Sequence, residues 1–390
     1  MFVVEHPPAA YSDPWAVTPF EARLMLLERG SAHIAYFYEK PDNSTFRYRV
    51  YNMIQALQAS ALDVGAACFH TDDIDRLDEV IDRADVLVVC RARYTDKLNR
   101  AILRARHQGK PVYFDVDDFV FDTDYVNLIV TTLDQDLKHP GIWDHWYAYI
   151  GRIGATLKLC DAAITTNAFL AGRIAEFAGL PTHVIPNFLN REQMEISTRI
   201  FEEKQRRGFQ RTEQIYVGYF SGTPTHTRDF QVASSALMDL MEADPRIVLR
   251  VVGYMELKDE WRRFASRVEF YPLHDFINLQ RLIGLVEINL VPLQDNVFTN
   301  CKSELKYFEA GIVGTLTVAS PIHTYAQAIE NGRNGYLARS LDWGPALETC
   351  IARLADYPAM AERAWQDAER RYAWYRQIPL IERTLLPRHV

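Results

Sequence analysis

NVFTNCKSELKYFEAGIVGTLTVAS, residues 296–320, joins a polar, charged stretch to an apolar run typical of a buried β-strand. Residues three and four apart are neighbours on a helix. The spacing therefore predicts a short helix over 303–312, with Lys302, Lys306 and Glu309 on one side. Two ammonium groups and a carboxylate beside a glycine-bounded loop suit a polyanion that also carries hydroxyl groups. An ordinary solvated helix face is the competing interpretation.

The pairing of helix and apolar strand recurs along the whole chain. Six strands are expected at 33–38, 65–70, 85–90, 112–116, 161–167 and 182–187, and six more at 215–220, 246–254, 267–272, 286–292, 315–320 and 335–338. Apolar strands that alternate with helices of ten or more residues indicate βαβ units and parallel sheets. The expected fold class is α/β, with two doubly wound Rossmann-like domains facing a central cleft.

A highly charged stretch at 188–213 interrupts this alternation and is the expected linker between domains. It separates an N-terminal domain at 1–187, which opens with an extension at 1–32, from a C-terminal domain at 214–368. Residues 369–390 are expected to form a helix that returns to the first domain.

The composition excludes several classes of protein. The chain has 390 residues, 48% of them hydrophobic, and a net charge of −8, which argues against a nucleic-acid partner. The five cysteines are scattered without a CxxC spacing, so neither a disulfide framework nor a zinc site is indicated. We find no secretory signal and no apolar run of membrane-spanning length, so the expected location is the cytoplasm.

Three carboxylates, Asp115, Asp117 and Asp118, gather where the strand at 112–116 ends. Their mutual repulsion disfavours clustering, so they need partners or a function. Three functional interpretations stay open: the nucleophile of a phosphatase of the haloacid-dehalogenase type on Asp115 and Asp117, a metal-binding DxD of a single-domain nucleotide-sugar enzyme, or an acid/base on the acceptor side of an interdomain cleft. Solvated aspartates capping a loop are the structural alternative.

GYFSGTPTHTRDF, residues 218–230, is a strand–loop–helix junction. The free amides and dipole of a helix N-terminus bind phosphate, and this loop would present Ser221, Gly222, Thr223 and His226. A turn with an ordinary helix cap explains the pattern equally well.

Two basic features have less specific meanings. Arg47 follows a turn at the start of a helix, where arginine binds phosphate or carboxylate or simply lines the surface. The basic helix at 97–110 suits either a solvated face or peripheral contact with an anionic membrane.

Together, the two-domain pattern and residues 296–320 resemble the GT-B glycosyltransferases, specifically the retaining family 4 type, over about residues 33–378. FEAGIVGTLTVAS matches the second half of the family's Glu-x7-Glu element, which assigns Glu309 to the carboxylate that binds the nucleotide's ribose. The first glutamate would stand at position 301, where this chain has Cys301. The local pattern is instead that of a subgroup with a KSxLKxxE element and a DxDD strand end.

The resemblance implies glycosyl transfer, with retention, from a nucleotide-diphosphate sugar to a glycan or lipid-linked acceptor in cell-surface polysaccharide synthesis. It implies no metal or other cofactor, and a place in the cytoplasm or at the inner face of the membrane. Asp117 takes the position of the family's catalytic histidine, with Asp118 beside it, while Arg47 and Asp115 lie on the acceptor side. The implied donor-binding residues are Ser221, Gly222, Thr223, His226, Lys302, Ser303, Lys306, Glu309 and Tyr325.

Other functions stay open besides the phosphatase. Cys301 in place of a glutamate is compatible with a catalytically silent GT-B scaffold that binds a nucleotide or a partner protein. A nucleotide-sugar epimerase would use the same two domains without an acceptor site.

Overall fold

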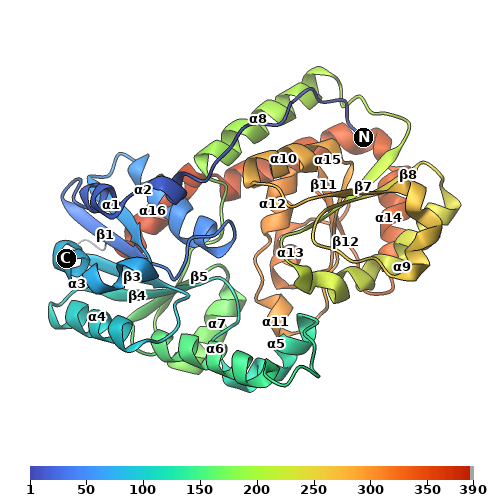
Figure 1. Ribbon diagram of the computed structural model, residues 1–390. Coiled ribbons are helices and arrows are strands. Elements are labelled where there is room, and N and C mark those ends of the chain that lie inside the picture. Colours follow the sequence, from blue (N-terminus) through green and yellow to red (C-terminus); the bar gives the residue numbers. More distant parts are fainter. Residues whose placement is uncertain (387–390) are drawn as a thin grey trace.

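The computed structural model describes residues 1–386, which form two sheets of six strands each. Neighbouring strands run parallel within both sheets. The two sheets and their helices lie side by side (Figure 1). This arrangement confirms the predicted α/β fold class with two doubly wound halves.

The first sheet has the order β2-β1-β3-β4-β5-β6. Successive connections leave β1 toward one edge and β3 toward the other, so the strand order reverses between β1 and β3. Loops at such a reversal diverge and leave room for a ligand beyond the carboxyl ends of the strands. Its strands are β1 (Ala32–Phe37), β2 (Val64–Phe69), β3 (Val86–Cys90), β4 (Val112–Val116), β5 (Ala162–Thr165) and β6 (Thr182–Val184).

The second sheet has the order β9-β8-β7-β10-β11-β12, so its reversal lies between β7 and β10. Because β7 and β10 are neighbouring strands, the loops that follow them lie next to each other. Its strands are β7 (Ile215–Ser221), β8 (Ile247–Gly253), β9 (Val268–Tyr271), β10 (Ile288–Val291), β11 (Leu316–Ala319) and β12 (Tyr336–Leu337).

Helices connect the strands and cover the sheets. In α4, the Thr95 side chain caps the helix by accepting a hydrogen bond from the Leu98 amide, and one apolar face is buried. The first half contains α1 (Phe20–Leu27), η2 (Arg47–Tyr51), α2 (Asn52–Gln58), α3 (Leu77–Arg83), α4 (Asp96–His107), α5 (Val126–Thr132), α6 (Ile142–Leu157) and α7 (Ala168–Ala178). The second contains α9 (Thr227–Ala243), α10 (Phe276–Leu285), α11 (Val297–Asn300), α12 (Leu305–Gly311), α13 (His323–Ala328), α14 (Trp343–Ala352) and α15 (Tyr357–Tyr372).

The charged stretch between the halves, predicted as the linker, is largely a helix, α8 (Arg191–Arg206). The Asn190 side chain caps it, and Met194, Ile200 and Phe201 are buried. The buried face also contains the charged residues Glu203 and Lys204, so the helix resembles a charged linker in sequence. Figure 1 shows α8 running from one half to the other.

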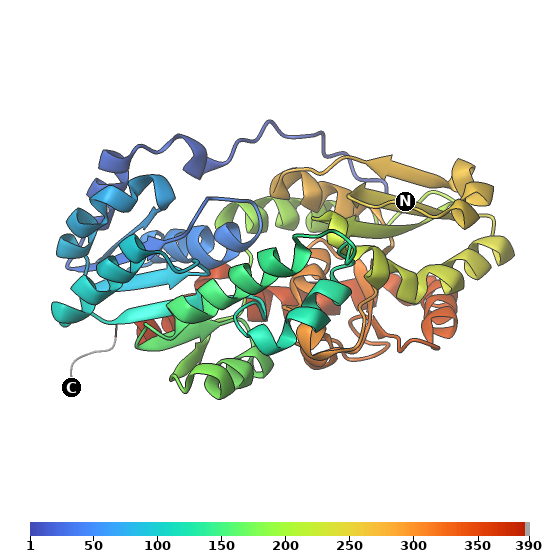
Figure 2. The same ribbon diagram turned by 60° about the horizontal axis from the view of Figure 1, so that its bottom comes forward.

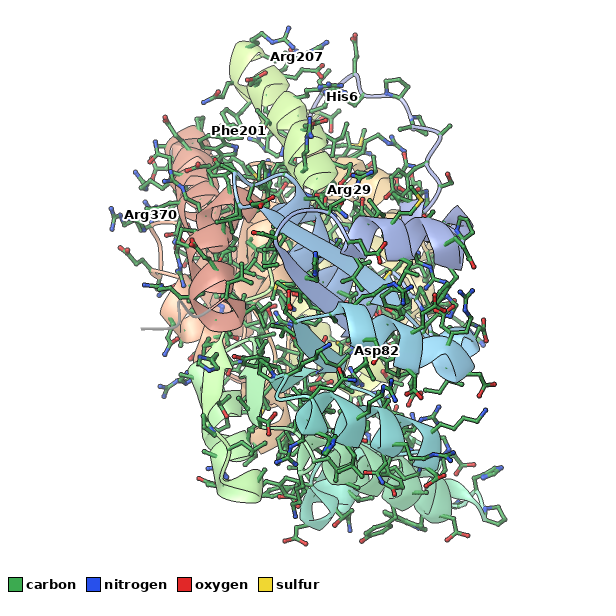
Figure 3. The ribbon with its side chains drawn as sticks, turned by 90° about the vertical axis from the view of Figure 1, so that its left-hand side faces the viewer. His6, Arg29, Asp82, Phe201, Arg207 and Arg370 are labelled. Atoms are coloured by element: carbon green, nitrogen blue, oxygen red, sulfur yellow. The ribbon has the colours of Figure 1, made fainter. Side chains whose placement is uncertain are left out.

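The first residues of the chain pack on the second half, although the sequence suggests an extension of the first. Phe2 is buried in the second core, 5.0 Å from the Tyr357 ring. Ala9 exchanges two backbone hydrogen bonds with the Asn278 amide side chain. Figure 3 shows this segment, at His6, beside the end of α8, which Arg207 directly follows.

The last described helix, α16 (Trp374–Leu385), lies against α2 of the first half. Ile381 and Leu385 are buried in a core cluster with residues of the first sheet. The Tyr113 hydroxyl donates to the Thr384 carbonyl at 2.9 Å. Positions 387–390 of the helix expected at 369–390 lie outside the described residues.

A second contact joins the halves at α5 and α11, which lie side by side in Figures 1 and 2. Phe298 and Cys301 belong to the second half by sequence, but both are fully buried in the core of the first. Nearby, the Asn296 amide donates to the Thr132 hydroxyl at 3.1 Å, and the Asn167 amide donates to the Cys301 carbonyl at 2.8 Å. The two halves are therefore fixed to each other on both sides of the junction.

Candidate active site at the domain junction

Glu309 lies at the junction of the two halves and is only 4% exposed. It sits on α12, and its Oε1 accepts hydrogen bonds from Tyr48, from Arg47 at 3.3 Å and from Gln193 at 3.1 Å. Within residues 1–386, Oε2 has no hydrogen-bond partner. One oxygen is thus fixed by the protein, while the other is free to accept a hydrogen bond from a ligand.

Two lysines precede Glu309 in the same segment, and the charges of Glu309 and Lys302 both act on Lys306. The pKa of Lys306 is lowered to about 8, mainly by burial and also by the charge of Lys302, although Asp229 and Glu309 oppose the shift. Lys306 donates no hydrogen bond to any described residue, and its nearest aromatic contact is Tyr219, at 5.4 Å. A half-buried ammonium group without an acceptor is an unfavourable arrangement in the free protein and is suited to an anionic ligand.

The loop after β7 leads into the N-terminus of α9 beside these lysines. Ser221 is buried and its hydroxyl donates to the Thr223 carbonyl, whereas Gly222 and Thr223 are exposed. A Cβ built on Gly222 would meet no other atom within 4 Å. The loop therefore presents backbone to open space at the reversal point of the sheet, where helix amides and dipole favour an anion.

His226 precedes α9 and is hydrogen-bonded to Asp229 at 3.0 Å. Burial lowers the pKa of His226, the bond to Asp229 partly opposes this, and Lys306 and Lys302 lower the pKa further. Asp229 also accepts two hydrogen bonds from Gln294 of the loop after β10. The Gln294 backbone amide donates at 3.2 Å, and the Gln294 side-chain amide donates at 3.0 Å. Asp229 thus joins the two loops of the reversal point.

The first half contributes Asp117 and Asp118 from the end of β4. Asp117 accepts hydrogen bonds from the Thr45 hydroxyl at 3.0 Å and from Arg91 at 3.2 Å. Asp118 faces the second half, with Oδ2 4.0 Å from the Lys302 ammonium. The structure thus brings Asp118 and Lys302 together across the junction.

Asp115 lies elsewhere, because it is fully buried in an ion pair with Arg49. Arg49 binds both carboxylate oxygens, at 2.8 and 3.0 Å. Burial raises the pKa of Asp115 to about 6, although Arg49 opposes the shift. With no exposed surface, Asp115 neither contacts an acceptor in this conformation nor presents a nucleophile for the phosphatase interpretation.

Three other residues predicted for the site are also buried here. Arg47 pairs with Glu309 and lies over the rings of Tyr48 and Phe276, so its guanidinium contacts the second half and not the open surface predicted for an acceptor. Tyr325 is 2% exposed, and after burial the charges of Glu304 and Glu309 raise its pKa further. Ser303 is buried, and its hydroxyl has no partner within the described residues.

The basic helix considered for membrane contact is neutralised by neighbouring acids. On α4, Lys97 pairs with Asp75, and Arg104 binds Asp82 at 2.8 Å. Among residues 1–386, no helix is long and apolar enough to cross a bilayer. Likewise, no group of three or more His, Cys, Asp or Glu in this part of the chain is arranged to hold a metal ion.

Sequence reasoning missed several residues that complete the site: Thr45, Tyr48, Arg91, Gln193 and Asp229. Arg91 could have been found because it directly follows a strand, and Asp229 because it stands three residues after His226 on a helix. Tyr48 and Gln193 carry no such local signal, because their partner is distant in sequence. Two surface hollows, around Gln55 and Arg191 and around Arg333 and Asp367, contain none of these residues.

Comparison with solved structures identifies the fold. The chain is similar to HepE from Anabaena, solved with UDP-glucose, at 15% identity and a TM-score of 0.58 over 90% of this chain and 98% of HepE. It is also similar to a Rickettsia africae glycosyltransferase (11%, TM-score 0.60, 91% and 98%). A third similar structure is sucrose-phosphate synthase from Thermosynechococcus elongatus (15%, TM-score 0.57, 90% and 98%).

These similarities show that the chain has the GT-B fold. No protein-family model matches the sequence, and no curated protein matches it.

Proposed function

We propose that this protein transfers a sugar from a nucleoside-diphosphate sugar to a hydroxyl acceptor, bound between its two domains. The observation that carries the proposal is the environment of Glu309. A nearly buried carboxylate at the junction has one oxygen fixed by three donors and the other free. A ribose supplies the vicinal hydroxyl groups that such an oxygen binds.

The donor diphosphate would lie between Lys302, Lys306 and the N-terminus of α9. As the sugar departs, the leaving diphosphate gains negative charge, and preorganised donors stabilise that charge. The backbone at Gly222, the hydroxyl groups of Ser221 and Thr223, and the ring of His226 would complete this part of the site. Ser303 and Tyr325 lie on the same side of the junction and would support the ribose and sugar.

The acceptor would approach from the first domain, where Asp117 and Asp118 would face the donor. We propose that Asp117 orients the acceptor hydroxyl or receives its proton, and that Asp118 adjoins the sugar opposite Lys302. Transfer with retention, and a glycan or lipid-linked acceptor of cell-surface polysaccharide synthesis, belong to the same proposal. A substrate panel with anomer-specific NMR detection of the product tests both.

The choice of nucleotide follows from the similar structures. HepE was solved with UDP and with UDP-glucose, so UDP is the first nucleotide to test here. A thermal-shift screen with UDP, GDP, dTDP and CMP should show one nucleotide stabilising the protein by several degrees. No stabilisation by any of the four would contradict the proposal.

Turnover distinguishes an enzyme from a silent scaffold. Release of UDP from UDP-glucose, or of the preferred nucleotide from its sugar, is expected even with water as acceptor. Nucleotide binding without turnover across a donor and acceptor panel would support the silent scaffold instead. That alternative rests on Cys301, which stands where the resembled family has a glutamate.

We also propose that transfer needs no divalent metal, because lysines and helix amides would neutralise the diphosphate. The expected result is unchanged turnover in excess EDTA. Loss of turnover that only Mg²⁺ or Mn²⁺ restores would contradict this.

A further inference from the structure

Arg91 has a strained backbone at the edge of the candidate site. It directly follows β3, and its φ of 42° lies in the left-handed region that residues other than glycine rarely adopt. Its amide donates to the Asp115 carbonyl at 2.8 Å, which continues the pairing of β3 with β4. Strain of this kind persists where the surrounding structure enforces it, and it is concentrated at functional sites.

The Arg91 side chain holds one end of a short hydrogen-bonded chain. Its Nη1 donates to the Thr45 hydroxyl at 3.0 Å and to Asp117 at 3.2 Å. The Thr45 hydroxyl in turn donates to Asp117, at 3.0 Å to Oδ2. Two donors from separate loops therefore fix the orientation of the Asp117 carboxylate.

These loops occupy the reversal point of the first sheet. Thr45 follows β1 and Arg91 follows β3, which are the two strands between which the order reverses. The segment that carries Thr45 continues into Arg47 and Tyr48, which bind Glu309. One four-residue segment thus connects the carboxylate of the acceptor wall to that of the donor wall.

The neighbouring ion pair Arg49–Asp115 is a purely structural pair, and the Arg91–Asp117 pair differs from it in geometry and exposure. It is bidentate, and both side chains are 0% exposed. The Arg91–Asp117 pair has one guanidinium contact, and its side chains are 19% and 15% exposed. The Asp117 carboxylate is therefore held in place but still accessible, whereas Asp115 is enclosed.

We propose that Arg91 is a positioning residue, which with Thr45 aims the Asp117 carboxylate at the acceptor hydroxyl during transfer. This inference rests on the proposed function. Arg91 does not contact the substrate in this account, and it acts only through Asp117. Misplacing a reacting group by about 1 Å costs on the order of 100-fold in rate.

The decisive variant is Arg91→Gly, because glycine adopts a φ of 42° without strain and the fold should be retained. Turnover of the preferred nucleotide sugar, chosen from UDP-glucose, GDP-mannose and dTDP-glucose, should fall on the order of 100-fold in kcat. KM for the donor should stay within about twofold, since no donor contact is lost. Millimolar guanidinium should restore part of kcat, and Arg91→Lys should give an intermediate value.

Arg93→Gly is the matched control. Arg93 lies two residues further on and directs its guanidinium to Glu39 at 2.6 Å, so kcat should be close to wild type and insensitive to guanidinium. If Arg91→Gly does not fold, Thr45→Val must show the same loss of kcat at constant KM.

Three results would overturn the inference: wild-type kcat in Arg91→Gly, an equal loss of kcat and donor affinity, or a loss that guanidinium does not restore. If the wild-type protein neither binds a nucleoside diphosphate nor turns over its sugar, the proposed function itself is contradicted, and the inference falls with it.

Discussion

Glu309 is the residue on which the proposed nucleotide site depends most. Replacing it with glutamine keeps its size but removes the charge that a ribose hydroxyl would meet. Hydrogen bonds to charged groups contribute about 1.5–3 kcal/mol, so Glu309→Gln should weaken binding of the preferred nucleoside diphosphate by that amount in calorimetry. Glu330→Gln, at an exposed carboxylate paired with Arg333, is the control. If both variants bind the nucleoside diphosphate equally tightly, Glu309 does not bind the nucleotide.

Lys306 should link nucleotide affinity to pH. Its pKa is about 8 in the folded protein and 10.5 in the reference state. The ammonium charge is present below about pH 8, so affinity for the nucleoside diphosphate should fall between pH 7 and 9. Lys306→Met should bind weakly across the whole range. A steep pH dependence that persists in Lys306→Met would assign the effect to another group.

The charged Lys306 should lower the free energy of unfolding of the protein without ligand. Between pH 8 and 10.5 the unfolded chain holds more protons at this position than the folded chain, so stability rises with pH across that window. At pH 7 the buried charge is fully destabilising, and Lys306→Met should raise the free energy of unfolding in urea. A lower free energy of unfolding would show that the ammonium group has a stabilising partner.

Asp117 should matter for turnover more than for donor binding. Asp117→Asn keeps the side-chain shape but removes the negative charge and the proton acceptor, and the acid–base contribution it would lose is on the order of 100-fold or more. Steady-state kinetics should show this loss in kcat with little change in donor affinity. Asp124→Asn, at an exposed aspartate of the next loop, should behave as wild type. Unchanged turnover in Asp117→Asn would make Asp117 a loop cap.

The aspartates also show where sequence reasoning stops at this scale. The pattern placed Asp115, Asp117 and Asp118 at one strand end but did not distinguish among them. The exposure of each carboxylate depends on an arginine that is distant in sequence. Asp115 is fully buried in its ion pair with Arg49, whereas Asp117 stays partly exposed in its ion pair with Arg91. Spacing along a strand carries no information about a partner that tertiary contacts supply.

At the scale of elements, all twelve strands lie where the alternation of apolar and polar stretches predicted them, within a few residues at the ends. The helix expected at 303–312 is α12, Leu305–Gly311. The stretch at 188–213, predicted to link the two domains, contains the helix α8, whose charged composition hides its apolar positions in the sequence. The burial of α11 in the other domain was not predictable, because it depends on how the domains meet.

The α11 contact should fix the relative position of the domains. Phe298 is fully buried in the core of the first domain, and truncating such a phenylalanine costs about 3–5 kcal/mol. Phe298→Ala should therefore lower the free energy of unfolding by about that amount and raise the radius of gyration in X-ray scattering. Leu341→Ala, at a side chain 93% exposed, should change neither. An unchanged radius of gyration would mean that the other contacts between the domains, such as that of α16, fix their relative position without α11.

At the scale of the molecule, the reversal points of the two sheets lie on the junction and supply the candidate site together. The β1/β3 reversal contributes Thr45 and Arg91, and the β7/β10 reversal contributes the loops of Ser221 and Gln294. The sequence was sufficient to predict an α/β fold with two doubly wound halves. The contacts across the junction, such as Arg47–Glu309 and Lys302–Asp118, became visible only in the folded chain.

The proposed function requires that a nucleoside diphosphate binds at this junction, with its ribose on Glu309. A crystal structure with the nucleotide that stabilises the protein most tests it directly. We predict ribose oxygens within hydrogen-bonding distance of Glu309 Oε2 and the diphosphate between Lys302, Lys306 and the first turn of α9. A nucleotide bound away from the junction, or one whose ribose makes no contact with Glu309, would contradict the account.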